Sequence, residues 1–199
     1  KMMDEALVVL TQKDEVLKGI ISEFGLPIIQ KREEGFASMC HIILEQQVSI
    51  ASAKAAYEKL VNLVGKVDPF TIHNATDEDL RSCGISRQKT IYLKDVAQRV
   101  IRKELSFSSL PMKTEQQIRN ELIQIKGVGN WSIDVYLMFC MQSQDIIPLG
   151  DIAIKNTLIE LYNCQSEEEI LAVSSNWKPY RTLASFIIWH YYLKKRGKI

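Results

Sequence analysis

The sequence predicts an all-α fold, and three observations support this prediction. Glycine and proline are scarce, with 9 and 5 among 199 residues, and both residues disfavour helix interiors. Apolar residues recur at the i, i+3, i+4, i+7 spacing that places them on one face of a helix. No stretch of useful length shows the apolar–polar alternation of a strand. We therefore expect about ten helices joined by short connections.

The predicted helices can be placed in chain order. Helical periodicity covers five stretches: residues 2–25, 36–47, 50–65, 86–105 and the segment after Pro179. Three helix starts carry the capping-box signature, a Ser or Thr followed three residues later by an acid or amide: Thr76, Thr114 and Ser166. Three segments lack these patterns and are expected to be loops: 66–74, 106–113 and 142–150.

Composition limits the class of protein. The formal net charge of +1 gives no basic surplus, so any nucleic-acid contact must rest on local features. The four cysteines are scattered without a CxxC pair: Cys40, Cys83, Cys140 and Cys164. This pattern argues against a zinc site, an iron–sulfur cluster or a disulfide framework. With no signal peptide and no apolar run long enough to span a bilayer, a cytoplasmic protein is expected.

The stretch "IKGVGNWSID" (125–134) suggests a binding turn. We expect Gly127 and Gly129 to adopt positive φ and to let the backbone approach a ligand. A helix then begins near Asn130, and the amides of a helix N-terminus are a natural phosphate site. Such a contact suits positioning on a DNA backbone. From these residues alone, an ordinary helix–helix turn is the simpler alternative.

Longer stretches resemble the helix-hairpin-helix DNA glycosylase superfamily. The hairpin segment "LIQIKGVGNWSIDVYLMF" is followed by "IIPLGDIAIKNTL", and three further segments occur in the family's order: "ILEQQVSIASAKAAYEKL", "CGISRQKTIYLKDVA" and "NWKPYRTLASFIIWHYY". The sequence is most similar to the bacterial 3-methyladenine DNA glycosylase II branch, from about residue 33 onward. The resemblance implies a helix-hairpin-helix motif at about 114–141. It also implies two helical lobes, 33–142 and 1–32 plus 143–199, with an active-site cleft between them.

The resemblance implies that Asp151 is the catalytic carboxylate. Cleavage of an N-glycosidic bond develops positive charge on the sugar, which a buried carboxylate stabilises while it orients the attacking water. From spacing alone, Asp151 would be the N-cap of a helix starting at Ile152, and the two roles can coexist. Asp134 lies inside a helix and is expected to be structural or to make a minor contact.

The resemblance also places residues around the flipped base. Bifunctional relatives carry a Schiff-base lysine where this chain has Trp131, which implies a glycosylase without lyase activity. Trp131 and Trp189 would line the base pocket, where an electron-rich ring attracts a cationic alkylated base. A core position is the alternative for Trp189. Val135 and Ile152 stand where close relatives place tyrosines, which implies a less aromatic pocket.

DNA contacts are implied by resemblance as well. Five hairpin residues would contact the DNA backbone: Lys126, Gly127, Val128, Gly129 and Asn130. Gln47 would enter the gap left by the flipped base, although a polar helix end explains "EQQ" equally well. The hairpin carbonyls of Ile123, Ile125 and Val128 would hold a monovalent cation. No other cofactor and no iron–sulfur cluster are expected.

Together these inferences favour a monomeric, bacterial, monofunctional DNA glycosylase that releases alkylated bases such as 3-methyladenine from double-stranded DNA. The alternatives are a non-catalytic helix-hairpin-helix DNA-binding protein and a glycosylase for another damaged base. A bifunctional glycosylase/lyase lacks its lysine at position 131. A helical scaffold that binds no DNA has only the near-neutral charge in its favour.

Overall fold

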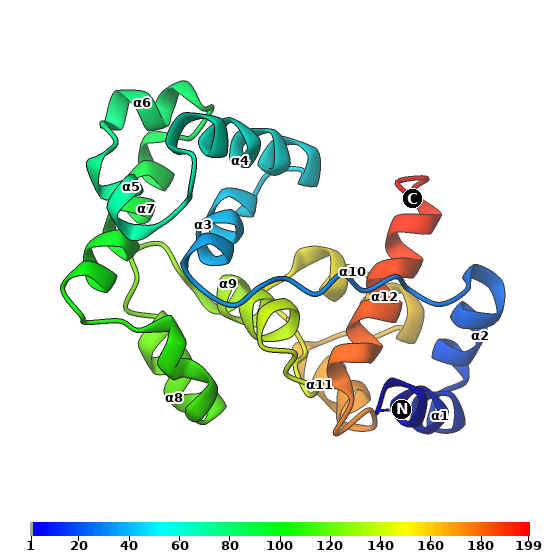
Figure 1. Cartoon of the computed structure of the whole chain (residues 1–199). Helices are drawn as coiled ribbons and strands as arrows, with labels where there is room; N and C mark the ends of the chain where they lie inside the picture. The colour runs from blue at the N-terminus through cyan, green and yellow to red at the C-terminus, as the bar shows by residue number, and fades with distance from the viewer. Residues whose placement is uncertain (1) are drawn as a thin grey trace. The chain divides into compact units, whose positions relative to one another are not determined.

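The computed structural model describes residues 2–199, which contain helices and connecting loops but no β-strand (Figure 1). The predicted all-α fold is therefore confirmed. The chain forms two compact units, one of residues 32–141 and one of residues 142–199 with the segment up to residue 31. Each unit is described by itself. Within residues 2–199, no helix is both long enough and apolar enough to cross a membrane.

The 32–141 unit is built around the apolar helix α3. Its elements are α3 (Phe36–Glu45), α4 (Ile50–Val64), α5 (Pro69–Asn74), α6 (Asp77–Ser82), α7 (Arg87–Ile101), the 3₁₀-helix η1 (Phe107–Met112), α8 (Glu115–Leu122), α9 (Asn130–Val135) and the π-helix η2 (Tyr136–Cys140). Helix α3 packs against α4, α7 and α9. It buries Met39, Ile42 and Ile43 completely, so its ends are held at fixed places in the unit.

The second unit joins helices from both ends of the chain. Its elements are α1 (Met2–Lys13), α2 (Glu15–Phe24), α10 (Ile152–Tyr162), α11 (Glu167–Ser175) and α12 (Arg181–Lys195). Helix α12 packs against α1, α2 and α10. Asp14 ties this core together, because its carboxylate accepts hydrogen bonds from the Leu17 amide (3.0 Å), the Tyr162 hydroxyl (2.8 Å) and the Trp177 indole (2.7 Å).

Helix starts follow the capping signals in the sequence. The side chains of Thr76, Thr114 and Ser166 each accept a hydrogen bond from the amide three residues on, and Thr114 forms a complete capping box with Gln117. All three predicted starts are confirmed. Two predicted loops are wrong in part. Residues 66–74 contain α5, which starts with a capping box of Asp68 and Thr71, and residues 106–113 contain the 3₁₀-helix η1.

Candidate active-site and DNA-contact residues

The hairpin turn between α8 and α9 requires glycine at one of its two glycine positions. Gly127 has φ 77°, in the left-handed region, and a Cβ built there would overlap the ring of Tyr92. Gly129 has φ −119°, which any residue adopts, and open space around its missing Cβ. The expectation of positive φ at both glycines is therefore wrong for Gly129. At Gly127 the absent Cβ makes room for Tyr92.

Two of the five predicted backbone-binding residues use their amides inside the protein. The Lys126 amide donates to Asp95 Oδ2 (2.9 Å), and the Val128 amide donates to the Ile125 carbonyl (3.1 Å). These two amides are therefore engaged within the unit. The contact of Lys126 and Val128 with the DNA backbone stays a prediction, and for Lys126 it concerns the exposed side chain. Gly127, Gly129 and Asn130 are exposed, and their amides donate no hydrogen bond to another part of residues 2–199.

Helix α9 places Trp131 in its first turn and Val135 one turn later. Trp131 is half-buried, whereas Val135 is buried with 3% of its surface exposed. Residues four apart share one face of a helix, so the indole and the valine lie on the same side of α9. Position 131 carries no amine that could attack a sugar carbon.

Residues 46–49, called here the Gln47 loop, follow α3. Gln47 is exposed and has φ 56°, a conformation that glutamine seldom adopts. The side chain of its neighbour Gln46 points to the hairpin. Gln46 Nε2 donates to the Gly127 carbonyl (2.9 Å) and to Ser132 Oγ (2.9 Å). Unusual backbone of this kind persists where surrounding contacts hold it, often at functional sites.

Two charged side chains fix the end of α3 just before the Gln47 loop. The Lys89 ammonium donates to the Leu44 carbonyl (2.8 Å), and the Arg32 guanidinium forms a two-pronged ion pair with Glu45. Burial lowers the pKa of Lys89 below its ordinary value. Lys89 thus supports the fold of this loop through its hydrogen bond to the Leu44 carbonyl.

Asp151 lies at the N-terminus of α10, in the second unit. Its Oδ1 accepts one hydrogen bond from the Ile154 amide (3.0 Å) and one from the Trp189 indole (3.2 Å). The N-cap role expected from spacing alone is therefore present, together with a contact to an aromatic ring. Trp189 is half-buried and packs against the core of its unit, whereas Ile152 is 74% exposed.

Asp134 has a structural role in the hairpin. The side chain is buried, and Arg119 on α8 donates to its Oδ1 (2.7 Å), which ties α8 to α9. Burial raises the pKa of Asp134, and the Arg119 guanidinium opposes that change.

The cysteines do not form a reactive or metal-binding group. All four are buried and free, and burial raises the pKa of the Cys140 thiol to about 11. A thiol with so high a pKa stays protonated at neutral pH and is a poor nucleophile. Among residues 2–199, no three His, Cys, Asp or Glu side chains are grouped so that they could hold a metal ion.

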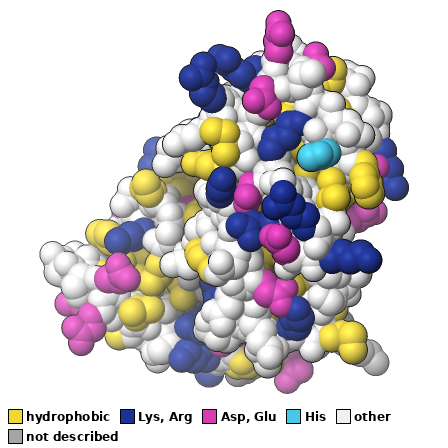
Figure 2. Space-filling view, turned by 90° about the vertical axis from the view of Figure 1, so that its left-hand side faces the viewer, with side chains coloured by type: hydrophobic (Ala, Val, Ile, Leu, Met, Phe, Trp, Pro, Cys, Tyr) yellow, Lys and Arg dark blue, Asp and Glu magenta, His cyan; other side chains and the backbone are white. Residues whose placement is uncertain are grey.

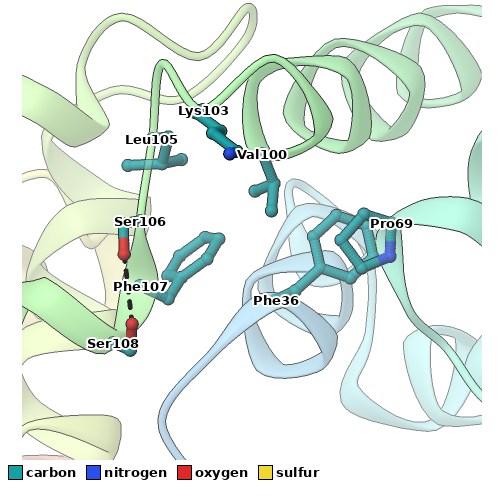
Figure 3. Close-up of a pocket in the computed structure, with 8 residues that line it drawn as sticks. All are labelled: Phe36, Pro69, Val100, Lys103, Leu105, Ser106, Phe107 and Ser108. Carbon is teal, nitrogen blue, oxygen red and sulfur yellow. Dashed lines mark hydrogen bonds between the residues drawn. The ribbon is translucent and has the colours of Figure 1, made fainter.

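Two surface features lie outside these residues. Lysine and arginine side chains are interspersed with acidic ones on the face shown in Figure 2, as the small net charge leads one to expect. A cavity of about 510 Å³ in the 32–141 unit (Figure 3) contains none of the predicted site residues. It is lined by Phe36, Pro69, Val100, Lys103, Leu105, Ser106, Phe107 and Ser108.

The fold and the hairpin together define a DNA-repair class. Residues 40–180 match the model of the HhH-GPD superfamily of base excision DNA repair proteins, and the chain belongs to this superfamily. A putative DNA-3-methyladenine glycosylase of Bacillus subtilis, YfjP, is 30% identical over 76% of this chain. The chain spans 56% of the length of YfjP. The alkylbase DNA glycosidase-like protein mag2 of Schizosaccharomyces pombe is 28% identical over 77% of this chain and 76% of mag2.

Solved structures share this fold. A DNA-3-methyladenine glycosidase from Bacillus halodurans has a TM-score of 0.78 and 28% identity, over 96% of this chain and 89% of that chain. The 3-methyladenine DNA glycosylase of Schizosaccharomyces pombe, solved with abasic DNA, has a TM-score of 0.85 over 96% and 97% of the two chains. Its identity of 23% supports a common fold.

Proposed function

We propose that this chain is a monofunctional DNA glycosylase of base excision repair that hydrolyses the N-glycosidic bond of alkylated bases such as 3-methyladenine. The observation that carries the proposal is the pairing of the Asp151 carboxylate with the Trp189 indole, at 3.2 Å. A module that only binds DNA needs neither residue. Membership of the HhH-GPD superfamily and the names of its relatives support the same activity.

In the proposed reaction, the bond between the sugar C1′ and the base nitrogen breaks, and its electron pair leaves with the base. The N-alkylated base already carries positive charge, so it departs as a neutral molecule without a strong acid. The Asp151 carboxylate stabilises the cationic sugar electrostatically. A water oxygen then bonds to C1′, and its proton passes to Asp151, as in general base catalysis.

The other proposed roles belong to recognition. The indoles of Trp131 and Trp189 attract the cationic base, with cation–π contacts worth ~0.5–2 kcal/mol each. Gln47 enters the gap that the flipped nucleotide leaves in the duplex. The exposed amides of Gly127, Gly129 and Asn130 hold a DNA phosphate. Ile152 and Val135 in place of tyrosines leave room for several alkylated bases.

A monovalent cation fits the hairpin chemically, because backbone carbonyls are suitable ligands for a hard cation. The carbonyls of Ile123, Ile125 and Val128 would hold it. The Ile125 carbonyl accepts one hydrogen bond from the Val128 amide and keeps a second lone pair for an ion. When bound, the cation would add positive charge next to a DNA phosphate.

The absence of an amine at position 131 supports hydrolysis without strand cleavage. The proposed partner is double-stranded DNA with an alkylated base, bound by a monomer. We also propose the bacterial cytoplasm as its location, which agrees with four free cysteines.

The test is base release from methylated duplex DNA. We expect the native protein to release alkylated bases and Asp151→Asn to reduce the single-turnover rate by about 10²–10⁴-fold, while both bind abasic DNA. Base release unchanged in Asp151→Asn would refute the catalytic assignment. DNA binding without any base release would point to a non-catalytic DNA-binding protein, and strand cleavage trapped by borohydride would point to a lyase.

A further inference from the structure

The loop before the proposed catalytic carboxylate is held by the first turns of α12. Residues 142–151, called here the Asp151 loop, contact Thr182 through three hydrogen bonds. The Thr182 amide donates to the Gln144 carbonyl (3.0 Å), and Thr182 Oγ1 donates to the Ser143 carbonyl (2.6 Å). The same hydroxyl accepts from the Ile146 amide (2.9 Å). One buried threonine therefore binds backbone groups at three positions of the loop.

Arg181 adds a charged contact to the same loop. Its Nε donates to Asp145 Oδ1 (2.7 Å) and its Nη2 to Asp145 Oδ2 (3.1 Å). Two parallel hydrogen bonds between guanidinium and carboxylate fix direction as well as distance. On the next turn of α12, the Ser185 hydroxyl donates to the Arg181 carbonyl of its own helix (2.8 Å), and the Ile146 carbonyl lies as a second, longer acceptor at 3.3 Å.

The contacts follow one face of α12 in register with the loop. Residues 181, 185 and 189 are each four apart, so they stand on successive turns, about 6 Å apart along the axis. They contact Asp145, Ile146 and Asp151 in that order. A slip of the loop by one residue would leave the buried Thr182 hydroxyl without its two backbone partners, and such unsatisfied groups are costly. The register of the loop is thus coupled to the contact between Asp151 and Trp189.

We propose that Thr182 is a positioning residue for base release, assisted by Arg181, and that it acts by fixing the Asp151 loop on α12 so that the Asp151 carboxylate meets the Trp189 indole. This inference rests on the proposed function, since it concerns the same carboxylate. A carboxylate stabilises a developing charge only at short range, and misplacement by about 1 Å can cost 10²-fold in rate.

The first test observes the contact itself, without catalysis. The chain has three tryptophans, so ¹H–¹⁵N spectra of the labelled protein show three indole signals. In Thr182→Val we expect the Trp189 indole signal to move, while that of Trp177, which donates to Asp14, stays in place. Thr182→Ser, which keeps the hydroxyl, should restore the native signal. An unmoved Trp189 signal in Thr182→Val would overturn the proposal.

A matched control separates positioning from general loss of a buried hydroxyl. Thr157 in α10 is also buried, but its hydroxyl donates to Ala153 of its own helix (2.6 Å) and not to the loop. Thr157→Val should leave the Trp189 signal unchanged, and an equal movement in both variants would overturn the proposal. If Thr182→Val fails to fold, Arg181→Lys serves instead, because it removes only the two-pronged contact with Asp145.

The second test measures catalysis. In single-turnover base release, we expect Thr182→Val to lower the rate by about 10- to 100-fold with affinity for abasic DNA within about twofold of native. A native rate in Thr182→Val would overturn the positioning role. If the native protein releases no base, the proposed function fails, whereas the indole spectra still decide whether Thr182 sets the Asp151–Trp189 contact.

Discussion

The Asp151 loop and the Gln47 loop are held in different ways. In the Asp151 loop, residues 143–146 are held mainly by α12, through the Thr182 and Ser185 hydroxyls and the ion pair between Arg181 and Asp145. The Gln47 loop depends on three separate parts of its unit. These are Arg32 before α3, Lys89 on α7 and the hairpin groups that accept from Gln46.

This difference predicts how each loop responds to change. Where one helix supplies most of the hydrogen bonds, a single substitution on that helix is expected to disturb much of the loop. Where separate elements share the task, each substitution removes only part of the support, and part of that support is electrostatic and sensitive to salt. Substitutions in the Gln47 loop and in the residues around it test this contrast, and their expected effects decrease in the following order.

The largest effect is expected at Gly127, whose carbonyl accepts from Gln46. Gly127→Ala places a Cβ in the Tyr92 ring at positive φ, and the backbone strain alone is worth roughly 1–2 kcal/mol. We expect the free energy of unfolding to fall by about 2 kcal/mol or more, measured by urea denaturation.

Gly129→Ala is the matched control for this change. Because Gly129 has extended φ and open space, its free energy of unfolding should stay within about 0.5 kcal/mol of native. Equal destabilisation by both substitutions would contradict the role given to Tyr92. DNA affinity can still fall in Gly129→Ala if a phosphate lies against that exposed backbone.

A smaller effect is expected at Gln46. Gln46→Ala removes two hydrogen bonds and leaves the buried Ser132 hydroxyl without this partner. We therefore expect the free energy of unfolding, measured by urea denaturation, to fall by about 1–2 kcal/mol.

Gln47→Gly should have the opposite effect and raise the free energy of unfolding by about 1 kcal/mol, because glycine adopts the left-handed backbone of this position without strain. Yet it should weaken binding to DNA with an abasic site. Destabilisation by Gln47→Gly would argue against strain at that residue.

A still smaller effect is expected at Lys89. Lys89→Met keeps the length of the side chain but removes its hydrogen bond to the Leu44 carbonyl, at a cost of about 1 kcal/mol or less in unfolding free energy. Thermal denaturation measures this loss of stability. The control is Arg87→Met, at an exposed position on the same helix, α7. If Lys89→Met instead weakened DNA binding without changing stability, Lys89 would be a DNA contact rather than a support of the loop.

The smallest effect is a pH dependence from His41 on α3. This ring stacks on Tyr57 at 4.4 Å between centroids, and burial lowers the pKa of His41 below 6.5, with Glu45 opposing and Arg32 adding to the change. The unfolded chain therefore binds the proton more readily. The neutral His41 ring therefore stabilises the folded state. This contribution is complete above pH 6.5 and is lost as the pH falls through the lowered pKa of the folded protein.

Urea denaturation from about pH 7 to 5 measures this dependence. His41→Gln should lose less stability over that range than the native protein, with the exposed His73→Gln as a control. Parallel profiles for native protein and His41→Gln would contradict the prediction.

Sequence patterns predicted the helices well because periodicity and capping are local. The start of α8 at Thr114 needed only four residues to recognise. Helix α5 was missed because its six residues are too few to show a period, although Asp68 followed by Pro69 is a start signal.

From the sequence, candidate site residues could be assigned only where a motif carries a family role, as for Asp151 and the hairpin, and these assignments stay predictions. Contacts that depend on the tertiary fold leave no local signal. The Lys126 amide meets Asp95 across 31 residues, and Gln46 meets Ser132 across 86. Positive φ was expected at both hairpin glycines, but Gly127 alone has it, and Tyr92 packs against Gly127 and not Gly129.

The dependence of the Asp151 loop on α12 also matters for recombining this chain with its relatives. A chimera that exchanges residues 142–151 alone would place a foreign backbone on Arg181, Thr182 and Ser185. A chimera that exchanges residues 142–189 as one cassette would carry the loop, its supporting turns and Trp189 together. Grafts intended to transfer base preference between glycosylases of this family should therefore cut before residue 142 and after residue 189.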